Sequence, residues 1–422
     1  MRQLNIFINQ FSVGTLAEEN DIWSFQYDKT WLENSHRYAI CPQIPLLAEK
    51  QTDGSSKRFI QWFFDNLLPE EGARTLLAKD ISADEADSFG ILTITGAESA
   101  GAITLIKEGD EIIEGSAVPL TSEHLNARIK KLPDIPLNNK TNKRMSIAGA
   151  QHKMLVIKKG NSFLEPEGSM PSSHILKPEH SKPNDYWQTV RNEWFVMNLA
   201  KKIGLNVPAT TVHYFPEAAY VIERFDRQGA YPHQERVHAL DGCQLLGLSR
   251  GAKYSQSTVE QLKSFCEKLR GKGAAKIAIL DWAIFNAIVG NTDAHLKNLS
   301  CLVTPNGLVL SPMYDLISTA IYDDGGNHVS AELSQSMGNA KVLGELTRED
   351  VFIFGESLGL SKIIAQRQLD KMLSKIETRA DEIIEQVTLF EDVNNKVGEL
   401  RMLREIRYKM IGEMVIKLKV NR

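Results

Sequence analysis

A long apolar stretch, Ala275–Val289, runs directly into a polar segment that begins at Gly290. The stretch is long enough to predict a buried helix. It carries Lys276 and Asp281 and is too short to span a bilayer. The chain is therefore expected to fold around this helix, which would hold the next residues rigidly at the edge of a core.

Those next residues read GNTDAHLKN over 290–298 and place Asp293 five residues before Asn298. Phosphoryl transfer to a hydroxyl needs a carboxylate to accept the proton and a neutral oxygen ligand for Mg²⁺ nearby. An Asp and an Asn at this spacing on one short loop supply both groups. Asp and Asn are also ordinary loop and capping residues, so the spacing alone is equally compatible with a structural loop.

The residues after Asn298 predict a β-hairpin, with strands at 300–303 and 308–310 and a turn around Asn306-Gly307. A hairpin returns the chain to near its starting point, which would bring Asp315 back beside Asn298. Asp315 and Asn298 could then hold the magnesium that bridges nucleotide phosphates. The order and spacing are those of a kinase catalytic loop.

The length of 422 residues predicts two or three domains. A net charge of -4 argues against whole-molecule attraction to nucleic acid or to an anionic membrane. The four cysteines are scattered without a C-x-x-C pair, and the N-terminus lacks the apolar region of a signal peptide. We therefore expect reduced cysteines and a cytoplasmic protein.

The order of predicted elements indicates an α+β protein, with a small β-rich part first and a large helical part second. The expected elements fall into two types. Strands are expected at 3–11, 23–27, 153–158, 173–176 and 219–225, and helices at 58–67 and 184–203. Beyond Ser257 the chain is expected to be mainly helical, with a helix and a strand in the basic tail 401–422.

Further candidate nucleotide contacts lie before the loop. Lys177 ends a strand and could reach phosphates, although a solvated lysine would look the same. Glu193 lies in a largely apolar helix and would need a cationic partner, for which Lys177 is the candidate; a place at the edge of a solvated face is the alternative. Glu223-Arg224-Phe225-Asp226 could form a hinge that binds adenine, with Asp226 reaching the ribose.

A turn and a histidine can likewise be interpreted as either functional or structural. The small-residue turn SIAGAQHK at 146–153 could cradle phosphates with its backbone N–H groups, or be an ordinary turn. His295 could contact transition-state charge or simply stabilise its loop.

Six motifs together resemble the HipA family of serine/threonine kinases, the toxins of bacterial toxin–antitoxin pairs. The matching segments are SIAGAQHK (146–153), HILKP (174–178), NEW (192–194), ERFDR (223–227), GNTDAHLKN (290–298) and SPMYDLIS (311–318). They occur in the family's order, and WFFDNLLPE at 62–70 resembles its N-terminal module. Ala294 departs from the glycine that is usual in the family.

The resemblance implies a two-lobed, protein-kinase-like α+β fold of HipA type. It divides the chain into an N-terminal β-rich subdomain at 1–105, a kinase N-lobe with a phosphate-binding loop at 106–226, and a helical C-lobe at 227–422.

The resemblance also implies roles for matching residues, with ATP and Mg²⁺ as cofactors. Asp293 would be the catalytic base, and Asn298 and Asp315 the metal ligands. Lys153 and Lys177 would contact the phosphates, and Ser146 would be autophosphorylated. The full set of implied nucleotide contacts is Ala148, Gly149, Ala150, Gln151, Lys153, Lys177, Glu223, Phe225, Asp226 and His295.

Members of such a family restrain growth by phosphorylating a cytosolic protein, with aminoacyl-tRNA synthetases among the targets. The implied partner is a small helix-turn-helix antitoxin that carries most of the DNA contacts. Two alternatives stay open at this point: a small-molecule or lipid kinase, and a non-catalytic corepressor scaffold. Activity on a protein but not on small hydroxyl compounds would distinguish a protein kinase from a small-molecule or lipid kinase. The intact trio Asp293, Asn298 and Asp315 argues against a non-catalytic scaffold.

Overall fold

The computed structural model describes residues 1–137, 148–149, 151–323, 328–390 and 395–420. The chain forms two compact units, each assembled from separate segments. Unit 1 comprises Met1–Lys177, Glu223–Gly251 and Cys301–Pro305, and unit 2 comprises Pro178–Ile222, Ala252–Ser300 and Asn306–Arg422. This division is coarser than the three ranges expected from the sequence, and it is discontinuous along the chain.

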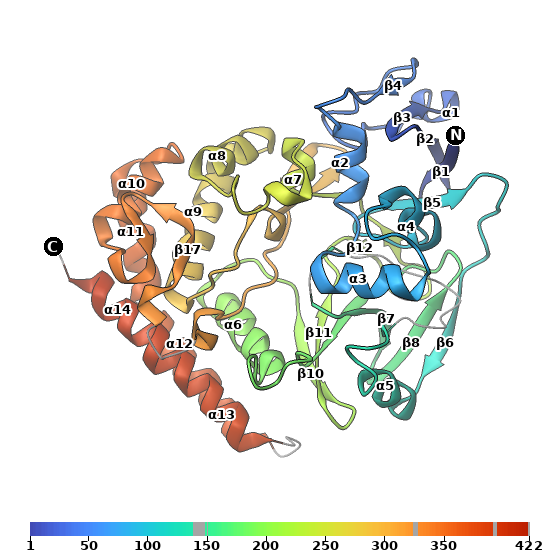
Figure 1. Cartoon of the computed structure of the whole chain (residues 1–422). Helices are drawn as coiled ribbons and strands as arrows, with labels where there is room; N and C mark the ends of the chain where they lie inside the picture. The colour runs from blue at the N-terminus through green and yellow to red at the C-terminus, as the bar shows by residue number, and fades with distance from the viewer. Residues whose placement is uncertain (138–147, 150, 324–327, 391–394, 421–422) are drawn as a thin grey trace. The chain divides into compact units, whose positions relative to one another are not determined.

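Unit 1 begins with an antiparallel sheet in the order β4-β3-β2-β1-β5 (Figure 1). Its strands are β1 (Arg2–Ile8), β2 (Phe11–Glu19), β3 (Ile22–Tyr27), β4 (Gln51–Thr52) and β5 (Ile103–Lys107). Leu4, Ile6 and Ile8 alternate with less buried residues along β1, as expected for a strand with one face on a core. The expected strands at 3–11 and 23–27 are thus confirmed with small shifts.

Aromatic side chains fill the space between this sheet and its helices. The helices of unit 1 are α1 (Lys29–Leu32), α2 (Phe59–Asp65), α3 (Glu71–Asp80), α4 (Ser88–Thr95), α5 (Ser122–Ile129) and α7 (Gly242–Leu246). Trp23 on β3 packs edge-on against Phe89 of α4 at a centroid distance of 5.1 Å, and its ring lies 6.5 Å from that of Phe64 on α2. The expected helix at 58–67 is α2.

A second antiparallel sheet in unit 1 has the order β9-β7-β8-β6. It is formed by β6 (Ser116–Leu120), β7 (Met154–Lys159), β8 (Ser162–Glu167) and β9 (His174–Pro178). Unit 1 also contains β12 (Arg227–Gln228), β13 (Glu235–Arg236), β14 (Ala239–Asp241) and all but the first residue of β15 (Ser300–Thr304). The sheet places the ends of β7 and β9, where Lys153 and Lys177 were singled out, on neighbouring strands.

Unit 2 is mainly helical, as expected. Its helices are α6 (Thr189–Ile203), α8 (Val259–Lys268), α9 (Lys272–Val289), α10 (Arg348–Ser357), α11 (Lys362–Leu373), α12 (Ile376–Leu389), α13 (Lys396–Glu405) and α14 (Gly412–Lys419). Its strands are β10 (Thr210–Tyr214), β11 (Ala218–Glu223, whose last residue belongs to unit 1), β16 (Gly307–Leu310), β17 (Glu332–Met337) and β18 (Ala340–Val342). Most of α9 is buried from Ile279 to Val289, which confirms the buried helix predicted from the apolar stretch.

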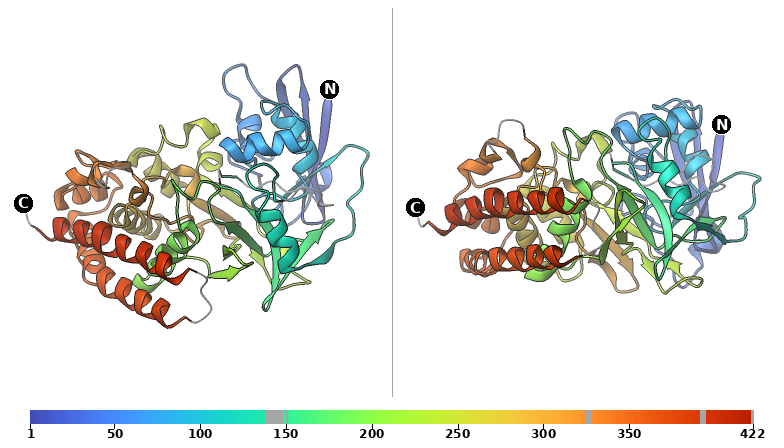
Figure 2. Two further views of the ribbon diagram at one scale, coloured as in Figure 1. Left: turned by 60° about the horizontal axis from the view of Figure 1, so that its bottom comes forward. Right: turned by 90° about the horizontal axis from the view of Figure 1, so that it is seen from below.

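Two expectations for unit 2 need correction. Helix α6 begins at Thr189 rather than near 184, because the chain turns at 182–186 and Gln188 has a left-handed φ of +54°. The tail contains no strand over the described residues up to 420, since α13, a π-helical segment η6 (Ile406–Ile411) and α14 follow one another without interruption. These helices lie alongside α12 in both views of Figure 2, with their apolar side chains buried.

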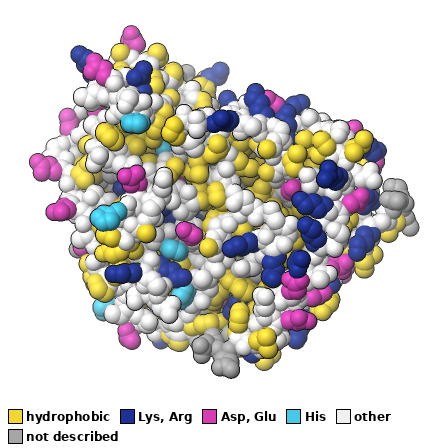
Figure 3. All heavy atoms as spheres, turned by 180° about the vertical axis from the view of Figure 1, so that it is seen from behind, with side chains coloured by type: hydrophobic (Ala, Val, Ile, Leu, Met, Phe, Trp, Pro, Cys, Tyr) yellow, Lys and Arg dark blue, Asp and Glu magenta, His cyan; other side chains and the backbone are white. Residues whose placement is uncertain are grey.

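All four cysteines are free and buried, which confirms the expectation of reduced, structural residues. Among the described residues, no helix has the length and apolar character needed to cross a membrane. On the face drawn in Figure 3, lysine and arginine side chains lie among acidic and hydrophobic ones. That distribution fits the small net charge of -4.

Candidate active site

The loop that carries Asp293 begins where α9 ends. Gly290 ends the helix in the left-handed region, with φ at +68°, a conformation that glycine adopts without strain. The next residue ties the loop back to the helix, because the side chain of Asn291 donates to Asn286 Oδ1 at 2.9 Å and accepts from the N–H of Asp293 at 3.1 Å. The position of Asp293 is therefore set by a buried helix end.

The carboxylate of Asp293 is half exposed, and the described side chains of Tyr254 and His295 lie at one of its oxygens. The hydroxyl of Tyr254 donates to Oδ1 at 2.6 Å, and Nε2 of His295 lies 3.9 Å from it. The rings of Tyr254 and His295 meet edge to face at 4.9 Å. A carboxylate that is half exposed in this way could accept a proton from an incoming hydroxyl.

Asn298 lies on the short 3₁₀ helix η2 (Leu296–Asn298), and its amide donates to the backbone oxygen of Asp293 at 2.8 Å. Strand β15 (Ser300–Thr304) follows, and β16 begins directly after the turn at Gly307, which has a φ of +108°. The N–H of Ser311 donates to the backbone oxygen of Ser300 at 2.9 Å. The predicted hairpin is confirmed, and it returns the chain to the end of the loop.

Tyr314 fixes the returning segment beside Asn298. Its hydroxyl bonds the backbone oxygen of Lys297 and the hydroxyl of Ser300, both at 2.7 Å. The neighbours of Asp315 and Asn298 in the chain are therefore joined directly, while the predicted approach of Asp315 to Asn298 stays a prediction. Asp315 itself has a φ of +58°, a strained conformation for a residue with a side chain and one that clusters at functional sites.

Residues far along the chain also hold this loop. The N–H groups of Thr319 and Ala320 donate to the backbone oxygen of Gly290 at 2.9 Å, and the Thr319 hydroxyl accepts from Thr292 N–H at 2.6 Å. On β17, the hydroxyl of Ser334 accepts from Ala294 N–H and donates to the backbone oxygen of Asn291. Sequence reasoning missed these residues and Tyr254, since no spacing signal connects residues 27 to 43 positions apart.

Glu193 and Asp315 approach one buried hydroxyl within unit 2. Burial, followed by the charges of Glu193 and Asp315, raises the pKa of Tyr220 well above its ordinary value. Next to Glu193, the side chain of Asn192 bonds both the backbone oxygen and the N–H of Ser318. Helix α6 is thereby tied to the segment that carries Asp315.

The predicted phosphate loop lies in unit 1, and Ser146 and Ala150 fall outside the described residues. The ammonium of Lys153 donates to the backbone oxygen of Ala148 at 2.8 Å, so it closes over the turn. Gly149 has a φ of +111°, and a side chain there would meet Lys153 Nζ at 2.5 Å. Gln151 lies between these positions. A tight turn beside a lysine is compatible with a phosphate cradle.

Lys177 is buried at the end of β9 in unit 1, whereas Glu193 belongs to unit 2. Their predicted pairing therefore stays a prediction. Glu223, at the end of β11, is exposed, and Phe225 is half-buried. The adenine contacts assigned to this segment also stay a prediction.

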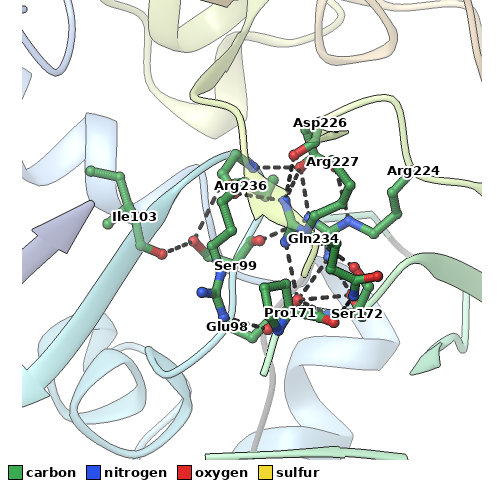
Figure 4. Close-up of polar contacts among 12 residues, drawn as sticks. Glu98, Ser99, Ile103, Pro171, Ser172, Arg224, Asp226, Arg227, Gln234 and Arg236 are labelled. Carbon is green, nitrogen blue, oxygen red and sulfur yellow. Dashed lines mark hydrogen bonds and ion pairs between the residues drawn. The ribbon is translucent and has the colours of Figure 1, made fainter. Parts of the chain in front are cut away.

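Arg224 and Asp226 belong to a buried charged cluster in unit 1, formed with Glu98, Arg227 and Arg236 (Figure 4). Glu98 pairs with Arg227 at 3.0 Å and Arg236 at 2.9 Å, and with Arg224 at 3.4 Å. Ser172 donates to the same carboxylate through both its N–H and its hydroxyl. The cluster joins three segments that are more than 50 residues apart.

Asp226 is occupied within this cluster. It accepts two hydrogen bonds from Arg224 and one from the N–H of Gly101 at 2.7 Å. Burial alone would raise the pKa of Asp226, but the charges of Arg224 and Arg227 outweigh it and lower the pKa to about 2. The structure therefore gives this carboxylate a structural task, and the predicted ribose contact would require it to exchange these partners.

Asn298 and Asp315 are the candidate metal ligands. Among the described residues, no cluster of three or more His, Cys, Asp or Glu side chains forms a closed metal site. Mg²⁺ is usually held by one or two protein oxygens together with phosphates and water, rather than by a full protein cage. One carboxylate and one amide oxygen fit that mode.

Two family models and several known proteins match this chain. Residues 4–106 match the family described as HipA N-terminal domain, and residues 145–388 match the HipA-like C-terminal domain. The chain is 30% identical to the serine/threonine-protein kinase toxin HipA of Shewanella oneidensis over 90% of its length and 89% of that protein. It is also 30% identical to the putative kinase Y4mE of Sinorhizobium fredii, over 96% of this chain and 99% of the other.

A solved structure shows the same fold. The Shewanella oneidensis MR-1 toxin–antitoxin complex of HipA, HipB and operator DNA contains a chain that matches with a TM-score of 0.81 and 27% identity. The match covers 97% of this chain and 96% of that one. The α+β, kinase-like fold of HipA type is therefore confirmed, and the chain belongs to the HipA family.

Proposed function

We propose that this chain is an ATP- and Mg²⁺-dependent serine/threonine protein kinase that acts as the toxin of a toxin–antitoxin module. The observation that supports this most is the hydrogen bond from Tyr314 to the backbone of Lys297, because it fixes the segments of Asp315 and Asn298 together. Asp293 lies on the same loop, held to Asn298 by the amide hydrogen bond of 2.8 Å.

In the proposed reaction, the hydroxyl of the acceptor protein attacks the γ-phosphorus of ATP. The bond from that phosphorus to the bridging oxygen breaks, and ADP leaves. Asp293 accepts the proton of the hydroxyl as the new bond forms. Lys177 and Lys153 would contact the phosphates, and Glu223 and Phe225 would hold adenine.

Asn298 and Asp315 would hold magnesium, which neutralises phosphate charge when bound. The left-handed backbone of Asp315 is consistent with a residue whose direction is set for a ligand. His295 is buried beside Asp293 and would contact the charge that develops on the transferring group.

A similar solved structure supports the proposed partner, whereas the target is proposed from the family resemblance alone. The similar solved structure is a complex with HipB and operator DNA, which supports a small HipB-like antitoxin as partner of this chain. We propose a cytosolic protein as the target, such as an aminoacyl-tRNA synthetase, whose phosphorylation would restrain growth.

We also propose that Ser146 is the autophosphorylation site and that its phosphate weakens ATP binding. About two negative charges on a loop that is to hold ATP phosphates would repel them. Titration with a fluorescent ATP analogue would compare phosphorylated protein with the Ser146→Ala variant. Equal affinities of the two forms would contradict this prediction.

A non-catalytic scaffold that touches DNA is less well supported. Several basic residues of the tail have acidic neighbours: Arg407 pairs with Asp381 and Glu377, and Lys409 pairs with Glu405. Such pairing reduces the positive charge that these residues offer to phosphates. A small-molecule or lipid kinase remains the second candidate, since the same loop would serve it.

The test is phosphate transfer from labelled ATP with Mg²⁺, with the sites mapped by mass spectrometry. The proposal expects labelled serine or threonine in a protein acceptor or in the chain itself. Labelling of small hydroxyl compounds alone would favour the second candidate, and no labelling of any acceptor would favour the scaffold.

A further inference from the structure

The hydroxyl of Tyr254 lies at the carboxylate that the proposed function uses as its base. It donates to Asp293 Oδ1 at 2.6 Å, a distance typical of strong hydrogen bonds between a hydroxyl and a carboxylate. Tyr254 is 53% exposed, so burial in a core does not explain its position. The residue comes from a segment 39 positions before Asp293.

The backbone around Tyr254 is fixed to the catalytic loop. The N–H of Leu296 donates to the backbone oxygen of Lys253 at 3.4 Å. Three residues after Tyr254, the hydroxyl of Ser257 accepts from the amide of Gln335 at 2.9 Å, and the same amide bonds the backbone oxygen of Ala294. Segment 252–257 is thus tied to the loop on both sides of Tyr254.

The ring of Tyr254 is also held in place. It meets His295 edge to face at 4.9 Å, and the ammonium of Lys253 lies 4.9 Å from its centre. The backbone and ring contacts leave the hydroxyl little freedom, so its direction toward Asp293 is built into the segment.

A half-exposed carboxylate needs a contact such as the Tyr254 hydroxyl to hold it in one orientation. The torsion that orients an aspartate carboxylate is broad, so an unrestrained group samples many directions. Proton transfer requires one oxygen to face the attacking hydroxyl within hydrogen-bond distance. A hydroxyl that fixes Oδ1 would direct Oδ2 toward the acceptor.

We propose that Tyr254 is a positioning residue for the catalytic base: it holds Oδ1 of Asp293 so that Oδ2 accepts the proton of the acceptor hydroxyl. This inference rests on the proposed function of Asp293. The competing interpretation is that Tyr254 caps the base and is displaced by the acceptor. The two make opposite predictions, since loss of a cap raises turnover or tightens acceptor binding, and loss of a positioning contact lowers turnover.

The test compares Tyr254→Phe with the unmodified chain in self-labelling from γ-labelled ATP with Mg²⁺. Two quantities are measured for each protein: the maximal labelling rate and the ATP concentration that gives half of it. The phenylalanine ring keeps the contact with His295 and loses only the hydroxyl. We expect the maximal rate to fall about tenfold with an unchanged half-saturating ATP concentration. Tyr408→Phe, at an exposed position of the π-helical segment η6, is the matched control and is expected to leave both values unchanged.

A double substitution separates action through Asp293 from a general structural effect. In the Asp293→Gln background, Tyr254→Phe is expected to change the residual rate less than about twofold, because the group it positions is already gone. An unchanged or faster rate of Tyr254→Phe alone would overturn the inference while leaving the proposed function intact. Phosphate on Tyr254 itself would also overturn it, by showing that the hydroxyl is an acceptor. If the unmodified chain labels neither itself nor any protein acceptor, the proposed function is overturned instead, and this inference with it.

Discussion

Single residues at this site are placed by contacts that a sequence shows only in part. The spacing of Asp293 and Asn298 is visible in the sequence, and so is the hairpin that returns Asp315. The strained backbone of Asp315 and the hydroxyl of Tyr254 are not visible, because they result from packing of distant segments. For the same reason, the sequence does not show that the oxygens of Asp226 accept from Arg224 and Gly101, and its ribose contact stays a prediction.

Glu179 provides a prediction at this scale. It accepts from the hydroxyl of Thr189 at 2.8 Å at the start of α6, and burial raises its pKa from 4.5 to about 7. The folded state therefore binds its proton more tightly than the unfolded state does. This contribution to the free energy of unfolding is complete below pH 4.5 and is lost as the pH rises through about 7.

Glu179→Gln stays neutral, so its free energy of unfolding is expected to fall less over this pH range than that of the unmodified chain. The difference should reach about 3 kcal/mol at most. Urea unfolding at several pH values would measure it, with Glu260→Gln, exposed in the first turn of α8, as control. Parallel pH profiles for the Glu179→Gln variant and the unmodified chain would show that Glu179 has an ordinary pKa.

Helices and strands were predicted best where a pattern of neighbouring residues indicates them. The apolar stretch identified α9, and Asn306-Gly307 identified the hairpin, since both signals lie within a few residues. The start of α6 was placed too early because a left-handed Gln188 leaves no mark in the periodicity. A strand was expected in the tail, but burial of the apolar side chains on a continuous helix decided otherwise.

The end of α9 is the element on which the loop depends most. Gly290 has a φ of +68°, and a Cβ there would lie 3.2 Å from Ala320 Cβ and closer still to Met410. Gly290→Ala is expected to reduce the free energy of unfolding by about 1–2 kcal/mol and to lower phosphotransfer with it.

Gly273, in the first turn of the same helix, is the matched control, since a Cβ there meets nothing within 4 Å. Gly273→Ala is expected to be neutral or to stabilise the protein by up to about 1 kcal/mol. Calorimetry and the labelling assay on both variants would check this. Equal effects at the two positions would mean that the backbone of Gly290 imposes no constraint.

At the scale of the whole molecule, each unit is built from segments that lie far apart in the sequence. In unit 1, Glu98 connects such segments. Its carboxylate is fully buried among Arg224, Arg227 and Arg236. No sequence pattern could predict this cluster, because its members lie up to 138 residues apart. The division into two units could not be predicted from the sequence either, since it depends on where separate segments meet.

Glu98→Gln would leave the arginines without their shared charge. We expect a loss of about 3 kcal/mol or more in the free energy of unfolding, the usual result of breaking a buried ion pair. Glu33→Gln, which removes an exposed pair with Lys29, is the control and should cost less than about 1 kcal/mol. Thermal unfolding would compare them, and similar shifts of both variants would show that the cluster adds little to stability.

The central claim is that Asp293 is the base of a phosphotransfer site completed by Asn298 and Asp315. The most direct measurement is the rate of phosphate transfer from labelled ATP with Mg²⁺, for the unmodified chain and for Asp293→Gln, with both shown to be folded. The account predicts transfer by the unmodified chain and a loss of at least about 100-fold in the variant. Undiminished transfer by Asp293→Gln would contradict it.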